Sequence, residues 1–288
     1  MRALGLVVAA GIFRSADSSR TEYALGEIAV RPKGIGGDCA REVCALGVTD
    51  VSKPRLVPDA KAELVLAALR PSEYTAALIQ VLQAKSATVR GGKVLEIGSG
   101  SGVVLAALGE LGAASLCGID IEEDAVTSGM LLLAELGHGE TAELYLGDMW
   151  LPVAGRRFDL IVANLPHFPM ERSDVPGRLP SWSAGGSNGR VLLDPFLEGL
   201  DAHLAADGRA IITHNAFVDL DCSRELLARH GLALSMALTT LVYIPDDKLS
   251  RMTASVLAAQ DGRTIHRYGP YAFGEMHIVE IARHGAVS

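Results

Sequence analysis

The segment Val94–Gly102, V-L-E-I-G-S-G-S-G, joins an apolar strand to a turn with glycine at every second position. A further apolar stretch predicts a helix over 102–111. Glycine adopts positive φ easily and lets a ligand approach the backbone closely. The free N–H groups at the start of the helix point toward whatever binds there. The order strand, glycine turn, helix therefore predicts a ligand-binding turn in an open α/β sheet.

Strand-like and helix-like segments alternate along the rest of the chain. With 93–97, seven strands are predicted, the others at 115–119, 142–146, 158–163, 209–214, 232–244 and about 275–282. Helices are predicted from Asp59 to before Pro71 and at 73–85, 122–136, about 189–205 and 220–230. Alternating units of this length are typical of a parallel sheet with helices on both faces.

The first 54 residues follow a different pattern. Glu27–Val30 and Glu42–Leu46 resemble short strands around a glycine-rich turn. We therefore expect a small β-rich appendage at 1–54 and one α/β domain at 55–288. The apolar start of the chain faintly resembles a signal peptide, but its single positive charge and the lack of a cleavage site favour an element packed on the domain.

Composition narrows the possible partners. Apolar residues make up 49% of the chain and the net charge is −8, which argues against nucleic acid as a partner. No apolar run is long enough to span a membrane. The four cysteines form no Cys-x-x-Cys pair and have no histidine partner at zinc-finger spacing. We expect a cytoplasmic protein that binds no metal.

Polar residues stand at the ends of the predicted strands. They are Glu96, Asp120, Asp148, Asn164 and His214. Because ligands bind outside the carboxyl ends of parallel strands, these positions predict one site. Two of them keep a second interpretation: Asp120 as a helix cap, and His214, with Asn215, as a neighbour outside the pocket.

The glycine spacing argues against a nicotinamide cofactor. The dinucleotide pattern G-x-G-x-x-G needs glycine three residues after Gly100, where this chain has Val103. Its third glycine is Gly102, and no second nucleotide-binding half follows.

With Gly147–Trp150 (G-D-M-W) and Asn164–His167 (N-L-P-H), this pattern resembles the class I S-adenosylmethionine-dependent methyltransferases. Within that class the chain resembles the release-factor glutamine methyltransferases and related N-methyltransferases. Their V-P-R-P-x-T-E-L, N-P-P-Y and G-G-x-D-G motifs correspond here to 57–64, 164–167 and 185–189. The resemblance implies a seven-stranded Rossmann-like sheet and S-adenosylmethionine as cofactor.

The resemblance also implies the cofactor-binding residues. Those expected to contact the methionine part, the ribose, the adenine or the transferable methyl are Glu96, Gly98, Ser99, Gly100, Gly102, Asp120, Ile121, Asp148, Met149 and Asn164.

The segment Asn164, Leu165, Pro166 and His167 is expected to be catalytic. An amide nitrogen is a poor nucleophile, so transfer depends on positioning it in line with the methyl group. The Asn164 side-chain oxygen and the Leu165 carbonyl would accept its two N–H groups. The acceptor would be a protein side chain or a small molecule. The sequence does not identify the acceptor or the acceptor atom that is methylated. It also does not identify the oligomeric state.

The chain departs from the family motif at two positions, with Leu165 in place of proline and His167 in place of tyrosine. His167 could stack on the acceptor, act as a base, or have no catalytic role. The long segment 165–188 is predicted to be a substrate-side flap, with Trp182 as a lid or an anchor. Two other functions remain open: an enzyme that rearranges or cleaves S-adenosylmethionine itself, and a non-catalytic binding module.

Overall fold

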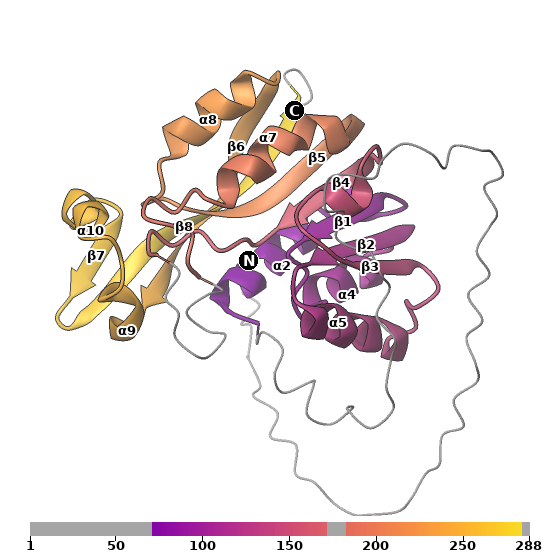
Figure 1. The fold of residues 1–288 in the computed structure, drawn as a ribbon, viewed down its shortest axis with the longest axis horizontal. Helices are drawn as coiled ribbons and strands as arrows, with labels where there is room; N and C mark the ends of the chain where they lie inside the picture. The colour runs from indigo at the N-terminus through magenta and orange to yellow at the C-terminus, as the bar shows by residue number, and fades with distance from the viewer. Residues whose placement is uncertain (1–70, 172–182, 284–288) are drawn as a thin grey trace, which may run out of the picture. The chain divides into compact units, whose positions relative to one another are not determined.

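The computed structural model describes residues 71–171 and 183–283 of the chain. Within these ranges eight strands form one sheet in the order β3-β2-β1-β4-β5-β8-β6, with β7 paired to β8 (Figure 1). Their bounds are β1 Lys93–Ile97, β2 Ser115–Asp120, β3 Ala142–Leu146, β4 Phe158–Ala163, β5 Leu204–Asn215, β6 Leu232–Ile244, β7 Ile265–Tyr268 and β8 Tyr271–Arg283.

The direction of the strands determines where a ligand can bind. β1 to β5 run parallel, and β8 lies antiparallel between β5 and β6. β2 and β4 flank β1 on opposite sides, so the strand order reverses at β1. The crevice outside the carboxyl ends of β1 and β4 is therefore the expected ligand site of this sheet.

Helices cover both faces of the sheet, as the sequence predicts. α2, α4 and α5 lie on one face and α7 and α8 on the other (Figure 1). Right-handed crossovers from β1 toward β2 and from β4 toward β5 run in opposite directions, which places their helices on opposite faces. The helices are α2 Glu73–Ala84, α3 Ser86–Val89, α4 Val103–Glu110, α5 Glu123–Glu135, the 3₁₀ turn η2 Leu151–Val153, α7 Leu193–His203, α8 Leu220–Ala228, α9 Asp246–Leu249 and α10 Ala254–Gln260.

The prediction of seven strands is short by one. All seven predicted strands are present, and β7 adds a short hairpin with β8 through Gly269. The sequence pattern also does not predict α9 and α10. α9 and β7 have four residues each and α10 has seven, which is too short for hydrophobic periodicity to identify them.

The predicted appendage at 1–54 and the predicted helix from Asp59 lie outside the described residues, so that division of the chain remains a prediction. In the described part, no helix is both long and apolar enough to cross a membrane.

Two glycines allow α4 and α5 to approach each other closely. Gly102, with φ 79°, precedes α4, and a Cβ placed there would lie 2.8 Å from the Cα of Gly129 in α5. The Cβ of any other residue would therefore separate the two helices at the glycine turn.

We expect Gly102→Ala to destabilise the fold more than Gly137→Ala. Both glycines have φ near 80°, but a Cβ at Gly137 has no atom within 4 Å. Each change costs about 1–2 kcal/mol of backbone strain, and the Gly102 change adds overpacking of about 1–3 kcal/mol. Urea denaturation of both variants measures the difference, and equal losses would contradict the close approach.

Candidate functional site

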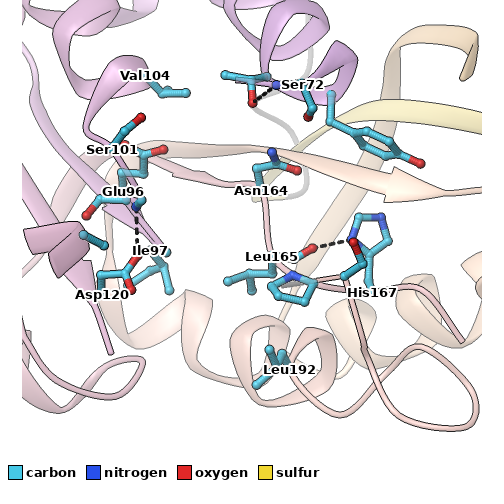
Figure 2. Close-up of a pocket in the computed structure, with 18 of the residues that line it drawn as sticks. Ser72, Glu96, Ile97, Ser101, Val104, Asp120, Asn164, Leu165, His167 and Leu192 are labelled. Atoms are coloured by element: carbon cyan, nitrogen blue, oxygen red, sulfur yellow. Dashed lines mark hydrogen bonds between the residues drawn. The ribbon is translucent and has the colours of Figure 1, made fainter. Parts of the chain in front are cut away.

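A cavity of about 470 Å³ opens at the carboxyl ends of β1, β2 and β4. One end of it is lined by the glycine turn, the end of β2 and the loop after β3. The other end is lined by the segment after β4, the start of α2 and the segment from β6 into α9. Figure 2 shows Glu96 and Asp120 near one end and Asn164, Leu165 and His167 near the other. Every predicted catalytic residue, and every predicted cofactor-binding residue except Gly102, lines this cavity.

The glycine turn adopts the conformation that its sequence predicts. Gly98, Gly100 and Gly102 all have positive φ. The N–H groups of Gly98 and Ser99 donate to the Ile119 carbonyl at 2.8 and 3.0 Å, which attaches the turn to β2. A Cβ on Gly98 would lie 3.2 Å from Leu165 Cδ2, so the turn and the segment after β4 are in close proximity.

Glu96 is a buried carboxylate with one free oxygen. Its side chain accepts a hydrogen bond from the Leu105 N–H in the first turn of α4. The residue is 2% exposed, and its Oε2 has no partner among the described residues. Burial and the nearby Asp120 raise the Glu96 pKa well above its usual value. A cationic group in the cavity would satisfy this oxygen and lower that pKa.

Asp120 connects the glycine turn to the start of α5. Its Oδ2 accepts from the Gly100 N–H at 2.8 Å and its Oδ1 from the Glu122 N–H at 3.0 Å. Burial raises the Asp120 pKa, although these backbone hydrogen bonds oppose the shift. Both interpretations of Asp120 therefore have support, because it binds backbone before α5 and still faces the cavity. A carboxylate has about four acceptor positions, so Asp120 keeps acceptor capacity for a ligand hydroxyl.

The loop after β3 carries strained backbone at the cavity. Among the described residues, Met149 is the one non-glycine residue with positive φ, at 47°. The neighbouring Trp150 stacks on His203 with ring centroids 4.6 Å apart and donates from Nε1 to the Pro195 carbonyl at 3.2 Å. Trp150 thus attaches this loop to α7, and Asp148 and Met149 line the cavity from it.

The segment after β4 is held by hydrogen bonds on both sides. Thr213 Oγ1 donates to Asn164 Oδ1 at 2.9 Å. His167 is 3% exposed, and its Nδ1 lies 2.5 Å from the Leu165 carbonyl oxygen. The pKa of His167 is lowered to about 4, chiefly by burial.

The glycine-rich segment 185–189 packs on the backbone of His167. A Cβ on Gly185 would lie 2.7 Å from His167 Cα, and one on Gly189 would lie 2.7 Å from His167 O. The sequence match of this segment to a family motif therefore has a packing explanation. Residues 172–182, which include Trp182, lie outside the described residues, so the flap remains a prediction.

Sequence reasoning missed two parts of the cavity wall. Ser72, Glu73, Tyr74 and Thr75 line it from the start of α2, whereas the family motif was matched to 57–64, which the structure does not describe. The available signal was a serine directly before an amphipathic helix. Lys248 of α9 also lines the cavity, with its Nζ 4.1 Å from the Phe168 ring centroid. Lys248 and Phe168 lie 80 positions apart in the sequence, so no local sequence pattern could predict that they meet.

His214 and Asn215 do not line the cavity. His214 is fully buried, its Nε2 is 2.9 Å from Ser223 Oγ, and its ring lies 6.3 Å from that of His167. Both residues lie behind His167. In the described ranges no cluster of acidic, histidine or cysteine side chains could hold a metal ion.

Comparison with known proteins adds to this geometry. A family model described as a methyltransferase domain matches residues 94–178. A relative from Methanocaldococcus jannaschii, provisionally named a protein N5-glutamine methyltransferase, is 32% identical over 149 residues, which cover 49% of this chain and 71% of the relative. The release factor glutamine methyltransferase of Rhodospirillum rubrum is 36% identical over 115 residues, 37% of this chain and 34% of that protein.

Another relative is matched over a smaller part of its length. The ribosomal protein L11 methyltransferase of Exiguobacterium is 39% identical over 75 residues, 26% of this chain and 24% of that protein. The chain thus spans about a quarter of that relative and about a third of the Rhodospirillum protein. The crystal structure of YcgJ from Bacillus subtilis has the same fold, with a TM-score of 0.51, 17% identity and coverage of 71% of this chain and 98% of that one.

The sheet order and the cavity define the Rossmann-like fold of class I methyltransferases. The chain belongs to the S-adenosylmethionine-dependent methyltransferases of that class, within the protein glutamine methyltransferase group.

We expect Glu96→Gln to stabilise the ligand-free protein at pH 8. The pKa of Glu96 is raised in the folded state, so the folded protein binds more protons than the unfolded chain and becomes less stable as pH rises. The gain in free energy of unfolding should shrink as pH falls toward 5. Urea denaturation at pH 5, 6.5 and 8 measures it, with the exposed Glu135→Gln as control. A gain independent of pH would contradict the role of the buried charge.

Proposed function

We propose that this protein transfers the methyl group of S-adenosylmethionine to the side-chain amide nitrogen of a glutamine in another protein. One observation carries the proposal: the glycine turn and the Asn164–His167 segment share one cavity and approach each other closely at Gly98 and Leu165. A donor bound at the turn would therefore present its methyl group to an acceptor held by the segment after β4.

The donor end of the cavity fits the groups of S-adenosylmethionine. The free Oε2 of Glu96 would accept from the ammonium of the methionine part. The remaining acceptor capacity of Asp120 suits the ribose hydroxyls. Ile121 is 58% exposed at the edge of the cavity and, with Met149, offers apolar surface to the adenine ring, while Asp148 would accept from the adenine amino group.

The acceptor end offers oxygens rather than a base. A primary amide has two N–H donors and a lone pair delocalised into its carbonyl. Asn164 Oδ1 and the Leu165 carbonyl would accept the two N–H groups and direct the nitrogen lone pair toward the methyl group. When bound, S-adenosylmethionine supplies an electrophilic methyl group, and the protein's contribution is positioning. The proton of the methylated nitrogen leaves afterwards to solvent.

The names of the relatives favour a protein acceptor. They are named for glutamine in release factors, for ribosomal protein uL3 or for ribosomal protein L11. We therefore infer a component of the translation machinery as acceptor, and hence a cytoplasmic location. Each of these relatives is named a methyltransferase, which favours transfer over rearrangement or cleavage of S-adenosylmethionine.

S-adenosylmethionine and its demethylated product should both bind in isothermal titration calorimetry. We expect Asp120→Ala to weaken this binding about tenfold or more, because charge-assisted hydrogen bonding to the ribose is lost. Asp207→Ala, at an exposed position in β5, is the matched control. If neither compound binds to the unchanged protein, the proposed function is wrong.

Asn164→Ala should lower kcat about 100-fold while leaving the Kd of S-adenosylmethionine within a few-fold, because one of the two acceptor oxygens is removed. Mass spectrometry of release factor and of ribosomal proteins uL3 and L11 after incubation with the protein and S-adenosylmethionine measures the transfer. A collapse of donor affinity in this variant would show that Asn164 acts on the donor instead.

A further inference from the structure

Three buried hydrogen bonds connect α2 to the segment after β4. Tyr74 Oη donates to Asn215 Oδ1 at 2.7 Å, and the Asn215 backbone N–H donates to His167 Nε2 at 3.0 Å. His167 Nδ1 then lies 2.5 Å from the Leu165 carbonyl oxygen, as the dashed line in Figure 2 shows. Tyr74, His167 and Asn215 are each at most 9% exposed.

These contacts determine the tautomer of His167. A backbone N–H can only donate, so Nε2 must be the unprotonated nitrogen that accepts from Asn215. In the neutral ring the proton then lies on Nδ1. A carbonyl oxygen can only accept, so Nδ1–H donates to Leu165. The assignment follows from partners whose own roles are fixed.

The same contacts leave His167 no capacity to act as a base. Its one unprotonated nitrogen already accepts from Asn215, and burial opposes a positive charge on the ring. The titratable side chains near the ring are Tyr74, His214 and Lys248. Burial raises the Tyr74 pKa and lowers the His214 pKa to about 3, so both side chains are neutral. Neither therefore supplies a negative charge that would favour a charged His167 ring.

A similar hydrogen bond holds the other oxygen expected to bind the acceptor, Asn164 Oδ1. Thr213 Oγ1 donates to Asn164 Oδ1 at 2.9 Å, and Thr213 is 2% exposed. Thr213 and Asn215 both belong to the end of β5, the strand beside β4. Each of the two oxygens therefore has one internal donor. Since an sp² oxygen accepts two hydrogen bonds, each keeps one position for an acceptor N–H.

We propose that His167 is a positioning residue, which holds the Leu165 carbonyl toward the acceptor amide in a tautomer set by the Asn215 backbone. The proposal rests on the proposed function. Tyr74 and Thr213 complete the arrangement: Tyr74 secures the Asn215 side chain, and Thr213 orients Asn164. The end of β5 thus sets the direction of both oxygens that receive the acceptor nitrogen.

Two substitutions separate the roles of the two ring nitrogens. In His167→Asn, the side-chain N–H₂ stands as many bonds from Cα as Nδ1 and can still donate to Leu165. In His167→Gln, the amide stands at the distance of Nε2 and loses that contact. On the acceptor that the unchanged protein methylates, we expect His167→Asn to keep kcat within about threefold and His167→Gln to lose about tenfold or more. Equal losses in the two variants would overturn the proposal.

The Kd of S-adenosylmethionine should stay within about twofold in both variants. A purely structural role would instead lower stability and donor affinity together with kcat. Thermal denaturation of each variant accompanies the kinetics for this reason.

A measurement on the unchanged protein does not depend on the variants folding. With ¹⁵N-histidine labelling, NMR should show His167 as a neutral ring protonated at Nδ1 throughout pH 5.5 to 8. Protonation at Nε2, or a titration within that range, would overturn the proposal. Failure of the proposed function is separate, because it would appear as absent methyl transfer by the unchanged protein while this NMR signature remains.

Discussion

The side-by-side placement of β1 and β4 is the constraint on which the site depends. Both strands are almost entirely buried, and their chains continue in opposite directions, one toward β2 and the other toward β5. Only at such a reversal do two loops diverge and leave a crevice between them. The glycine turn leaves β1 there and Asn164–His167 leaves β4, so a donor and an acceptor can meet without any movement of the sheet.

Two buried acids make the ligand-free donor end electrostatically unfavourable. Glu96 has an unpartnered oxygen and Asp120 raises its pKa further, while burial also raises the pKa of Asp120. Removing charged groups from water costs free energy unless an opposite charge or hydrogen bonds compensate. Backbone N–H groups from the turn and from α4 compensate in part, and a cationic ligand would complete the compensation. A ligand with a cationic group would therefore be favoured by charge as well as by shape.

Local pattern was sufficient to predict from the sequence that Glu96, most of the glycine turn and Asp120 line one cavity. Glu96, the glycine turn and Asp120 lie within 25 residues, and each is marked by its place at the end of an apolar strand. The acceptor end could be predicted only as far as Asn164–His167. Lys248 reaches the cavity through tertiary packing, which leaves no periodic signal. The start of α2 is marked only by a serine before an amphipathic helix, and this pattern does not show that it reaches the cavity. The role of His167 depends on an amide from β5, so the sequence alone left three roles open: stacking on the acceptor, acting as a base, or none in catalysis.

The wall of the cavity is formed by segments that lie far apart in the sequence and are therefore synthesised at different times. The donor end lies within residues 96–149, whereas the acceptor end also needs Val242, Pro245 and Lys248. Between these come about a hundred residues of chain, including β5, whose end fixes both acceptor oxygens. Since a domain folds as a unit and contacts between distant segments form late, the cavity would be complete only after β6 and α9 have joined the sheet. The proposed methyl transfer would therefore depend on the finished sheet, because β6 and α9 complete the wall of the cavity opposite the glycine turn.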